Sequence, residues 1–337
     1  MAFQTGSIIL FAMQLPESLI HKIEDLLHGR PFKDLQLAWA EMSEAYRQGQ
    51  PIIPNELQAL AYIIGRAPGT YAAMRRVLEL SLASYQQPLR THLDVGSGPG
   101  TAVWAARDIL DGSLRSIALD RNPAWRKWAT TIAPDLTWKL HECALTPLPK
   151  AELVTAGYML NELPAAQVTT VLGHLWDATE QVLVIVEPGT PAGFERILQA
   201  RTHLMEAGAH VIAPCPGWTR CPLAGTSNWC HFGVRFNRPR FQKLGKESER
   251  GWEDEMFSFL AVSRSPSPHS EGRVMHHPQK RGGHVWVELC TKGEIERAVL
   301  SRRQGDLYRA ARRAHWGDAW PPAAGAADPE EESTTPL

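Results

Sequence analysis

A short apolar run that ends in a glycine-rich loop, HLDVGSGPG at residues 92–100, most constrains the fold of this chain. From residue 90 onward, short apolar runs alternate with stretches of helical periodicity, which is the pattern of a doubly wound α/β sheet. The glycine loop then lies at the first strand-to-helix turn. We expect strands at 92–95, 116–119, 136–140, 153–157 and 181–186, and helices at 101–110, 124–133, 165–177 and 192–207.

The loop predicts a site for S-adenosylmethionine. Its G-x-G-x-G spacing differs from the G-x-G-x-x-G of dinucleotide sites, and Asp94 before it can accept a hydrogen bond from a cationic amino group, which this cofactor carries. Asp120 ends the second expected strand, where a carboxylate can accept ribose hydroxyls. A purely structural turn is the alternative. The predicted cofactor residues are Asp94, Gly96, Ser97, Gly98, Gly100 and Asp120.

Candidate catalytic residues follow the fourth expected strand, in the run GYMLNELP at 157–164. Asn161 and Glu162 can accept hydrogen bonds from a substrate amine, and Tyr158 can stack on a base. Methyl transfer from a sulfonium needs alignment more than covalent help. The competing interpretation is that Glu162 only caps the following helix.

The chain divides into five predicted segments. A helical region covers 1–88, because apolar residues recur there at helical spacing. The Rossmann-like core, a class I methyltransferase sheet, covers 89–208, and its last two strands are expected at 256–262 and 285–289. A cysteine-rich, metal-binding insertion covers 209–255. Residues 256–320 comprise the final strands of the core and a basic segment, and an acidic tail at 321–337 is expected to be disordered.

Four cysteines can hold a metal centre. Cys215, Cys221 and Cys230 have the spacing C-x5-C-x8-C, and Cys290 follows at the end of an apolar run. The C-x2-C pairs of common zinc sites are absent from this set, and a cubane iron–sulfur cluster also takes four thiolates. The spacing leaves zinc, a [4Fe-4S] cluster and four buried free thiols as alternatives. Five cysteines in 337 residues do not form a secreted disulfide scaffold.

Charge is segregated along the chain. Residues 201–316 carry 19 basic and 11 acidic side chains, although the whole chain has a formal net charge of −1. Basic side chains interleaved with aromatic ones favour an RNA partner, and a solvated charged face is the alternative. The candidate RNA-contacting residues are Arg235, Arg238, Arg240, Lys243, Lys246, Lys280, Arg281, Arg302, Arg303, Arg309, Arg312 and Arg313, with Phe236, Phe241, Tyr308 and Trp316.

Several motifs together resemble the small-ribosomal-subunit methyltransferase-like family of bacteria and mitochondria. They are RAPGTY at 66–71, DVGSGPG at 94–100, NELP at 161–164, EPG at 187–189, APCP at 213–216, WCHF at 229–232, EDEMFSF at 253–259 and ARRAHWGD at 311–318. The resemblance implies an S-adenosylmethionine fold that engages small-subunit ribosomal RNA. It also implies that the four cysteines hold a [4Fe-4S] cluster rather than zinc. One departure is Gly217-Trp218, where the family commonly has a histidine and an acid.

We therefore expect an RNA-directed methyltransferase, or a methyltransferase-derived assembly factor, for the small ribosomal subunit. A binding protein that transfers no methyl group and a zinc-containing small-molecule methyltransferase are the rival interpretations. No stretch is long and apolar enough to span a bilayer. We expect a bacterial cytoplasmic protein that acts as a monomer.

Overall fold

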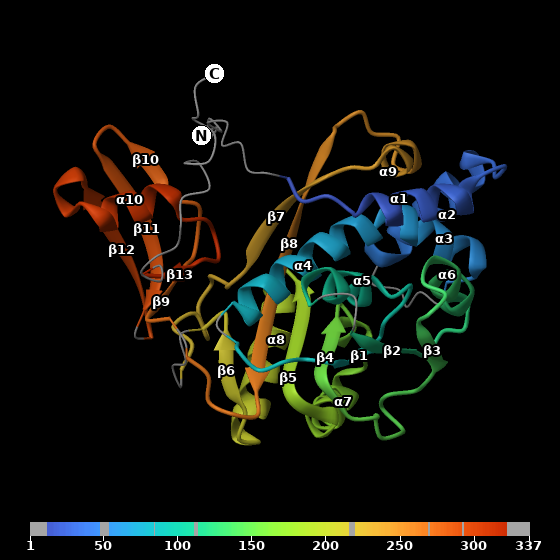
Figure 1. Ribbon diagram of the computed structural model, residues 1–337, viewed down its shortest axis with the longest axis horizontal. Helices are drawn as coiled ribbons and strands as arrows, with labels where there is room; N and C mark the ends of the chain where they lie inside the picture. The colour runs from blue at the N-terminus through green and yellow to red at the C-terminus, as the bar shows by residue number, and fades with distance from the viewer. Residues whose placement is uncertain are drawn as a thin grey trace.

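A computed structural model of the chain describes residues 12–47, 54–83, 85–110, 114–215, 220–268, 270–291 and 293–321 (Figure 1). A large mixed sheet lies at the centre with helices on both faces, and a smaller sheet with one helix lies beside it. The expected disordered tail, 321–337, lies outside the described residues except for its first position.

The large sheet has the order β3-β2-β1-β4-β5-β8-β6 in the described part of the chain, and β7 pairs with β8. Its first five strands run parallel, as the alternating pattern predicts. Both faces of β1 are covered, so Leu93 and Val95 are buried while only the first residue is partly exposed. The bounds are β1 (Thr91–Val95), β2 (Arg115–Asp120), β3 (Thr137–Leu140), β4 (Ala151–Gly157) and β5 (Thr179–Pro188).

The helices between these strands also lie where the sequence predicts them. In α6, Trp125 and Trp128 are buried three residues apart and contact α3 (Glu56–Gly65). Trp125 meets the Tyr62 ring edge-on, and the Trp128 indole donates to the Glu56 carbonyl. Before α8, the Thr190 side chain accepts a hydrogen bond from the Gly193 amide and Pro191 takes the first helical position, which fixes the start of this helix. The bounds are α5 (Thr101–Ile109), α6 (Ala124–Ile132), α7 (Ala165–Ala178) and α8 (Pro191–Glu206).

The last strands of the sheet differ from the prediction. The sixth strand is β6 (His210–Ala213), and β8 (Trp252–Ser263) runs antiparallel between β5 and β6. The expected strand at 256–262 is therefore the reversed strand, and the expected strand at 285–289 was wrongly placed in this sheet. A four-residue strand leaves little signal in the sequence. Residues 285–289 alternate buried and exposed positions, which is typical of a strand covered on one face.

Four helices form the first part of the chain, α1 (Glu17–Leu27), α2 (Phe32–Arg47), α3 (Glu56–Gly65) and α4 (Ala67–Leu82). The Asn55 side chain accepts amide hydrogen bonds at the start of α3 in a capping box with Gln58. Helix α4 buries Tyr71 and Met74 and packs on α5 and β8. No described helix is long and apolar enough to cross a membrane.

The smaller sheet has its own core. Helix α10 (Asp306–Arg313) covers one face and buries Tyr308 and Ala311 with apolar side chains of β11. Strand β11 pairs with β9, β10 and β12, and β13 pairs with β9. The bounds are β9 (Gly272–Val274), β10 (Gln279–Arg281), β11 (His284–Thr291), β12 (Glu294–Ser301) and β13 (Ala319–Trp320).

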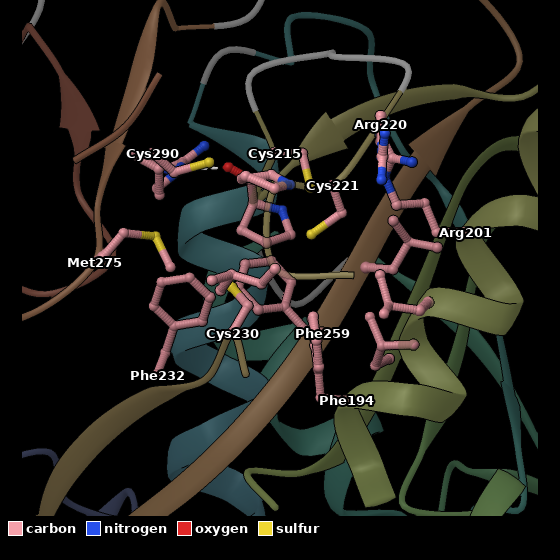
Figure 2. A pocket seen from close by; sticks show the side chains of 17 residues that line it. Phe194, Arg201, Cys215, Arg220, Cys221, Cys230, Phe232, Phe259, Met275 and Cys290 are labelled. Atoms are coloured by element: carbon pink, nitrogen blue, oxygen red, sulfur yellow. Dashed lines mark hydrogen bonds between the residues drawn. The ribbon is translucent and has the colours of Figure 1, made fainter. Parts of the chain in front are cut away.

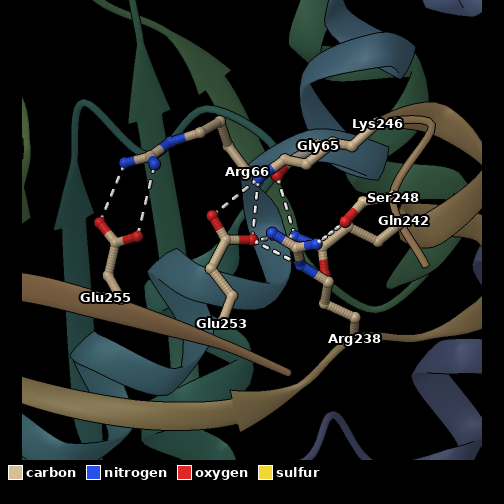
Figure 3. A network of polar contacts seen from close by, with 8 residues as sticks. All are labelled: Gly65, Arg66, Arg238, Gln242, Lys246, Ser248, Glu253 and Glu255. Carbon is tan, nitrogen blue, oxygen red and sulfur yellow. Dashed lines mark hydrogen bonds and ion pairs between the residues drawn. The ribbon is translucent and has the colours of Figure 1, made fainter. Parts of the chain in front are cut away.

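Ion pairs hold the β7–β8 hairpin against the first helices (Figure 3). Strand β7 (Phe232–Asn237) leads into α9 (Arg240–Gly245), and Glu253 on β8 accepts hydrogen bonds from Arg238 at 3.0 Å and Lys246 at 2.9 Å. Two residues further, the buried carboxylate of Glu255 accepts two hydrogen bonds, at 3.0 and 3.3 Å, from the Arg66 guanidinium between α3 and α4. The Arg66–Glu255 pair fixes the junction of α3 and α4 relative to β8, whereas the Glu253 pairs hold α9 and the end of β7 on the same strand.

The Arg66–Glu255 pair should be important for stability. In Glu255→Gln a neutral amide replaces the carboxylate, and Arg66 loses its counter-charge, so we expect the free energy of unfolding to fall by roughly 1–3 kcal/mol. Asp254→Asn is the matched control on the same strand, because its pair with Arg235 is exposed and should contribute below about 1 kcal/mol. Urea unfolding measures both. Equal losses for the two variants would contradict this ranking.

Candidate cofactor cleft and cysteine cavity

A cleft of about 570 Å³ opens at the carboxyl ends of β1, β2 and β4. Ligands of doubly wound sheets bind at this edge, and the volume suits a small molecule. The glycine loop and the segment after β4 line one side, while Tyr62, Thr70 and Met74 of α3 and α4 line the other. The predicted cofactor residues that line the cleft are Asp94, Gly96, Ser97, Gly98 and Asp120.

The glycine loop needs its glycines for backbone reasons. Gly96, Gly98 and Gly100 have φ values of 67°, 52° and 91°, in the region that side chains disfavour. A Cβ atom on Gly96 would lie 2.6 Å from the Cβ of Met159, so the loop touches the segment after β4. Gly100 does not line the cleft. It precedes α5 and its amide donates to the Ser97 carbonyl, so it shapes the turn.

Asp94 is buried at the floor of the cleft. Its Oδ1 accepts a hydrogen bond from Thr155 at 2.7 Å, whereas Oδ2 has no partner among the described residues. Burial raises the pKa of Asp94 to about 7, and the Thr155 hydrogen bond opposes this shift. The Thr101 hydroxyl is also buried without a described partner, whereas the buried Ser97 hydroxyl lies beside Asp94 and likewise opposes the rise of its pKa. A carboxylate oxygen and a hydroxyl are thus available to a polar ligand.

A buried polar chain beneath Asp94 fixes its orientation. Because Thr155 donates its proton to Asp94, its oxygen accepts from Nε2 of His92 at 2.8 Å. Burial lowers the pKa of His92 to about 3, so the ring is neutral and carries its proton on Nε2. Nδ1 is then left as the acceptor for Ser116 at 3.4 Å. The chain holds Asp94 Oδ1 inward and leaves Oδ2 for the cleft.

Asp120 is placed at the end of β2, as the strand pattern predicts, but it already holds the glycine loop. Its two oxygens accept the amides of Gly98 at 2.8 Å and Asn122 at 2.9 Å. Each carboxylate oxygen has a second lone pair. Contact with ribose hydroxyls therefore stays a prediction.

The two predicted catalytic residues lie differently. Both belong to a short 3-10 helix, η1 (Leu160–Glu162), after β4. Glu162 lines the cleft and lies 3.8 Å from Arg121, whereas Asn161 is not among the lining residues. The buried carboxylate of Glu187 accepts the Leu160 amide at 3.0 Å and so holds this segment on the sheet.

Residues from the first helices were missed as parts of the site. Tyr62, Thr70 and Met74 are far from the glycine loop in sequence, and only tertiary packing brings them to the cleft. Tyr158 lies beside them with a φ of 58°, an unfavourable backbone conformation for a tyrosine. Its hydroxyl donates to Glu255 at 3.4 Å. The Arg66–Glu255 pair is therefore connected to the cleft through Tyr158.

The four predicted metal-binding cysteines line one small cavity of about 30 Å³ (Figure 2). Cys215 follows β6, Cys221 lies in the next turn, Cys230 precedes β7, and Cys290 lies on β11 of the smaller sheet. Within the described residues, no group of three or more His, Cys, Asp or Glu side chains is arranged to hold a metal ion. The fifth, Cys143, is buried and borders the cofactor cleft instead.

Two buried arginines adjoin these thiols. Arg201 of α8 and Arg273 of β9 line the same cavity, and they are 5% and 6% exposed. Burial raises the pKa of Cys215 and Cys230, and that of Cys290 to about 12, and the neighbouring thiols contribute to the shifts. The cavity thus contains thiols with raised pKa values and the two buried guanidiniums of Arg201 and Arg273.

The predicted RNA-contacting residues fall into two groups. Arg235, Arg238 and Lys246 pair with carboxylates of β8, so much of the first basic cluster stabilises the hairpin. Phe236 and Phe241 are buried in the core. The second group lies on or beside the smaller sheet, where Arg302, Arg303 and Arg309 are exposed.

Residues 56–321 match the family described as mitochondrial small ribosomal subunit Rsm22, and the chain belongs to this family. The human ribosome assembly protein METTL17, mitochondrial, is 32% identical over 327 residues, a match that covers 87% of this chain and 68% of the human protein. The Rsm22-cox11 tandem protein 2, mitochondrial, of Schizosaccharomyces pombe is 26% identical, and the match covers 78% of this chain and 43% of that protein.

Among solved structures, magnesium protoporphyrin IX methyltransferase from Synechocystis has a TM-score of 0.40 at 12% identity and covers 73% of this chain and all of its own. A SAM-dependent methyltransferase from Aquifex aeolicus has a TM-score of 0.38 at 13% identity, with coverage of 66% and 98%.

The prediction of a bacterial cytoplasmic protein was wrong, because the curated relatives are mitochondrial proteins. That prediction followed from the low cysteine content and from the absence of a stretch that could span a bilayer, and neither distinguishes bacteria from mitochondria.

Proposed function

We propose that this protein binds S-adenosylmethionine and acts on, or assists assembly of, the small ribosomal subunit as an rRNA methyltransferase-like protein. The observation that carries the proposal is the free Oδ2 of Asp94 among the described residues, buried beside a glycine loop at the ligand-binding edge of the sheet. A buried carboxylate suits a cationic ligand and disfavours a phosphate. The family match supports the ribosomal partner.

Each residue of the cleft then has a proposed role. Asp94 accepts a hydrogen bond from the cofactor ammonium, Ser97 contacts its amino-acid part, and Asp120 accepts from ribose. The glycines let the loop approach the ligand closely. The cofactor supplies a methyl group on a sulfonium, and the proposed role of Glu162, which lines the cleft, is to orient an acceptor amine.

We also propose that Cys215, Cys221, Cys230 and Cys290 hold a [4Fe-4S] cluster, with zinc as the alternative. Four soft thiolates suit either. A 2+ core with four thiolates carries a net charge of 2−, and the buried guanidiniums of Arg201 and Arg273 would balance it with two positive charges. Because Cys290 comes from the smaller sheet, a centre at this place would link the two sheets.

The partner is proposed to be small-subunit ribosomal RNA or a pre-ribosomal small subunit, bound by a monomer. The second basic group, on the smaller sheet, supports RNA as the contacted component.

A non-catalytic assembly factor is the second candidate function. Of the two predicted catalytic residues, only Glu162 lines the cleft and Asn161 does not. Labelled S-adenosylmethionine and immature small subunits discriminate the two. Label in RNA that is lost in Glu162→Gln supports the enzyme. Binding of cofactor and subunit without label supports the factor.

Cofactor binding should depend on pH through Asp94. Since only the ionised carboxylate attracts the ammonium and its pKa is about 7 without ligand, affinity for S-adenosylmethionine should fall about tenfold from pH 8 to pH 6. Asp94→Asn keeps an acceptor for Thr155 and should bind weakly at every pH. Calorimetry at several pH values measures this. Asp135→Asn, which alters an exposed pair with Arg107 outside the cleft, is the control. Tight binding by Asp94→Asn would refute the role of Asp94.

The metal proposal predicts a selective loss on cysteine replacement. Protein purified without oxygen should contain about four iron and four sulfide per chain, and Cys290→Ser should lose most of both and unfold at a lower temperature. Cys143→Ser, outside the cavity, should keep them. Elemental analysis and the visible spectrum decide. One zinc per chain would select the alternative, and no metal in wild-type protein would contradict both.

A further inference from the structure

The face of the smaller sheet that α10 leaves uncovered presents a tryptophan between two arginines. The Arg297 guanidinium lies 4.0 Å from the centroid of the Trp286 ring, and that of Arg281 lies 5.9 Å from it. Val299, directly across from Trp286 on β12, is 50% exposed. We call Trp286, Arg281, Arg297 and Val299 the Trp286 face.

Strand alternation explains why these side chains point outward. Val285, Val287 and Leu289 are buried against α10, so the even-numbered residues of β11 point to the opposite side. Strand pairing puts Arg281 opposite His284, and Arg297 opposite Glu288, in the rows on either side of Trp286. The sheet therefore aligns one aromatic ring and two cations on one surface.

The positive charges of the two arginines are available to an external anion. Neither Arg281 nor Arg297 forms an ion pair with a carboxylate among the described residues. A similar arrangement on the hairpin differs in this respect. There Arg235 lies 3.6 Å from the Trp252 ring centroid, and Asp254 neutralises it through two hydrogen bonds at 2.8 and 2.9 Å. Residues 272–320, which form the smaller sheet and α10, carry ten basic and five acidic side chains, and this net positive charge attracts polyanions.

We infer that the Trp286 face binds unpaired RNA, a base stacking on the Trp286–Arg297 pair while the arginines contact flanking phosphates. Tryptophan and guanidinium planes both stack on bases, and stacking requires a base outside a duplex. An acidic protein segment would pair with Arg281 and Arg297 but would not need to stack on the Trp286 ring. The inference rests on the proposed function and specifies which surface and which form of RNA it uses.

The Trp286 face also leads toward the cysteine cavity. Cys290 lies on β11 four residues beyond Trp286 and has the same strand parity, at a distance of about 13 Å along the strand. The pairing of His276 with Glu288, at 3.4 Å, lies between them. An RNA strand on this face would therefore approach the place where the two sheets meet.

The test is binding of the full chain to a fluorescent unstructured RNA of about twelve nucleotides, which spans one single-strand site, measured by anisotropy. Trp286→Ala should bind about tenfold more weakly, in line with the loss of one stacked base, and Trp286→Phe should recover most of the affinity. Trp252→Ala is the matched control and should bind as the wild type does. In the double variant Arg281→Gln/Arg297→Gln, the slope of log K against the logarithm of the salt concentration should become shallower by about 1.4, because two phosphate contacts are lost.

The outcomes separate this inference from the proposed function. Wild-type affinity in both Trp286→Ala and the double variant would overturn the inference and leave RNA binding to another surface. The inference would also be overturned if the wild type bound duplex RNA as tightly as unstructured RNA. It would fail as well if Trp286→Ala weakened binding of an acidic peptide as much as it weakened binding of RNA. If wild-type protein binds no RNA, the ribosomal partner in the proposed function fails together with the inference. The double variant changes only exposed side chains, so it serves if Trp286→Ala does not fold.

Discussion

Strand β8 is the constraint on which the rest of the structure depends. Its C-terminal half is inserted antiparallel between β5 and β6 and completes the large sheet, and its N-terminal half pairs with β7 beyond the sheet edge. The outer half carries Glu253 and Glu255, which bind cations from α9 and from the junction of α3 and α4. Because α3 and α4 line the cofactor cleft, one strand sets both the sheet and the wall of the site.

Electrostatics then select the ligand. A buried carboxylate with one oxygen bonded to Thr155 and the other without a described partner favours a cation. In the cysteine cavity the signs are reversed, since two buried guanidiniums adjoin four thiols. The chain thus has a buried carboxylate at the cleft, which suits the proposed cofactor, and buried positive charges at the cysteine cavity, which suit the proposed metal centre.

The sequence predicted the parts of the fold that have local signals. The parallel strands, their helices and the glycine loop follow from apolar periodicity and from backbone conformations that only glycine adopts easily. Strand β6 was missed because four residues carry little pattern, and β11 was assigned to the wrong sheet because an apolar run does not reveal its partner. Tyr62 and Thr70 reach the cleft only because α4 packs on β8 and α3 packs on α4 and α6, which no local pattern encodes. The convergence of Cys290 with the other three cysteines was expected from the family resemblance, whereas Arg201 and Arg273 were not singled out.

The cleft and the cavity are lined by different residues, and among the described residues the smaller sheet contributes only to the cavity. This division suits a protein in which the cofactor fold provides a rigid base and the smaller sheet provides the contact with a larger partner.

The measurement that tests the central claim most directly is a crystal structure with S-adenosylhomocysteine bound, grown above pH 7. The ligand ammonium should lie within about 3 Å of Asp94 Oδ2, the usual length for a charge-assisted hydrogen bond, with the adenosine against the end of β2. A ligand bound elsewhere, or an Asp94 that turns away from the ammonium, would contradict the account.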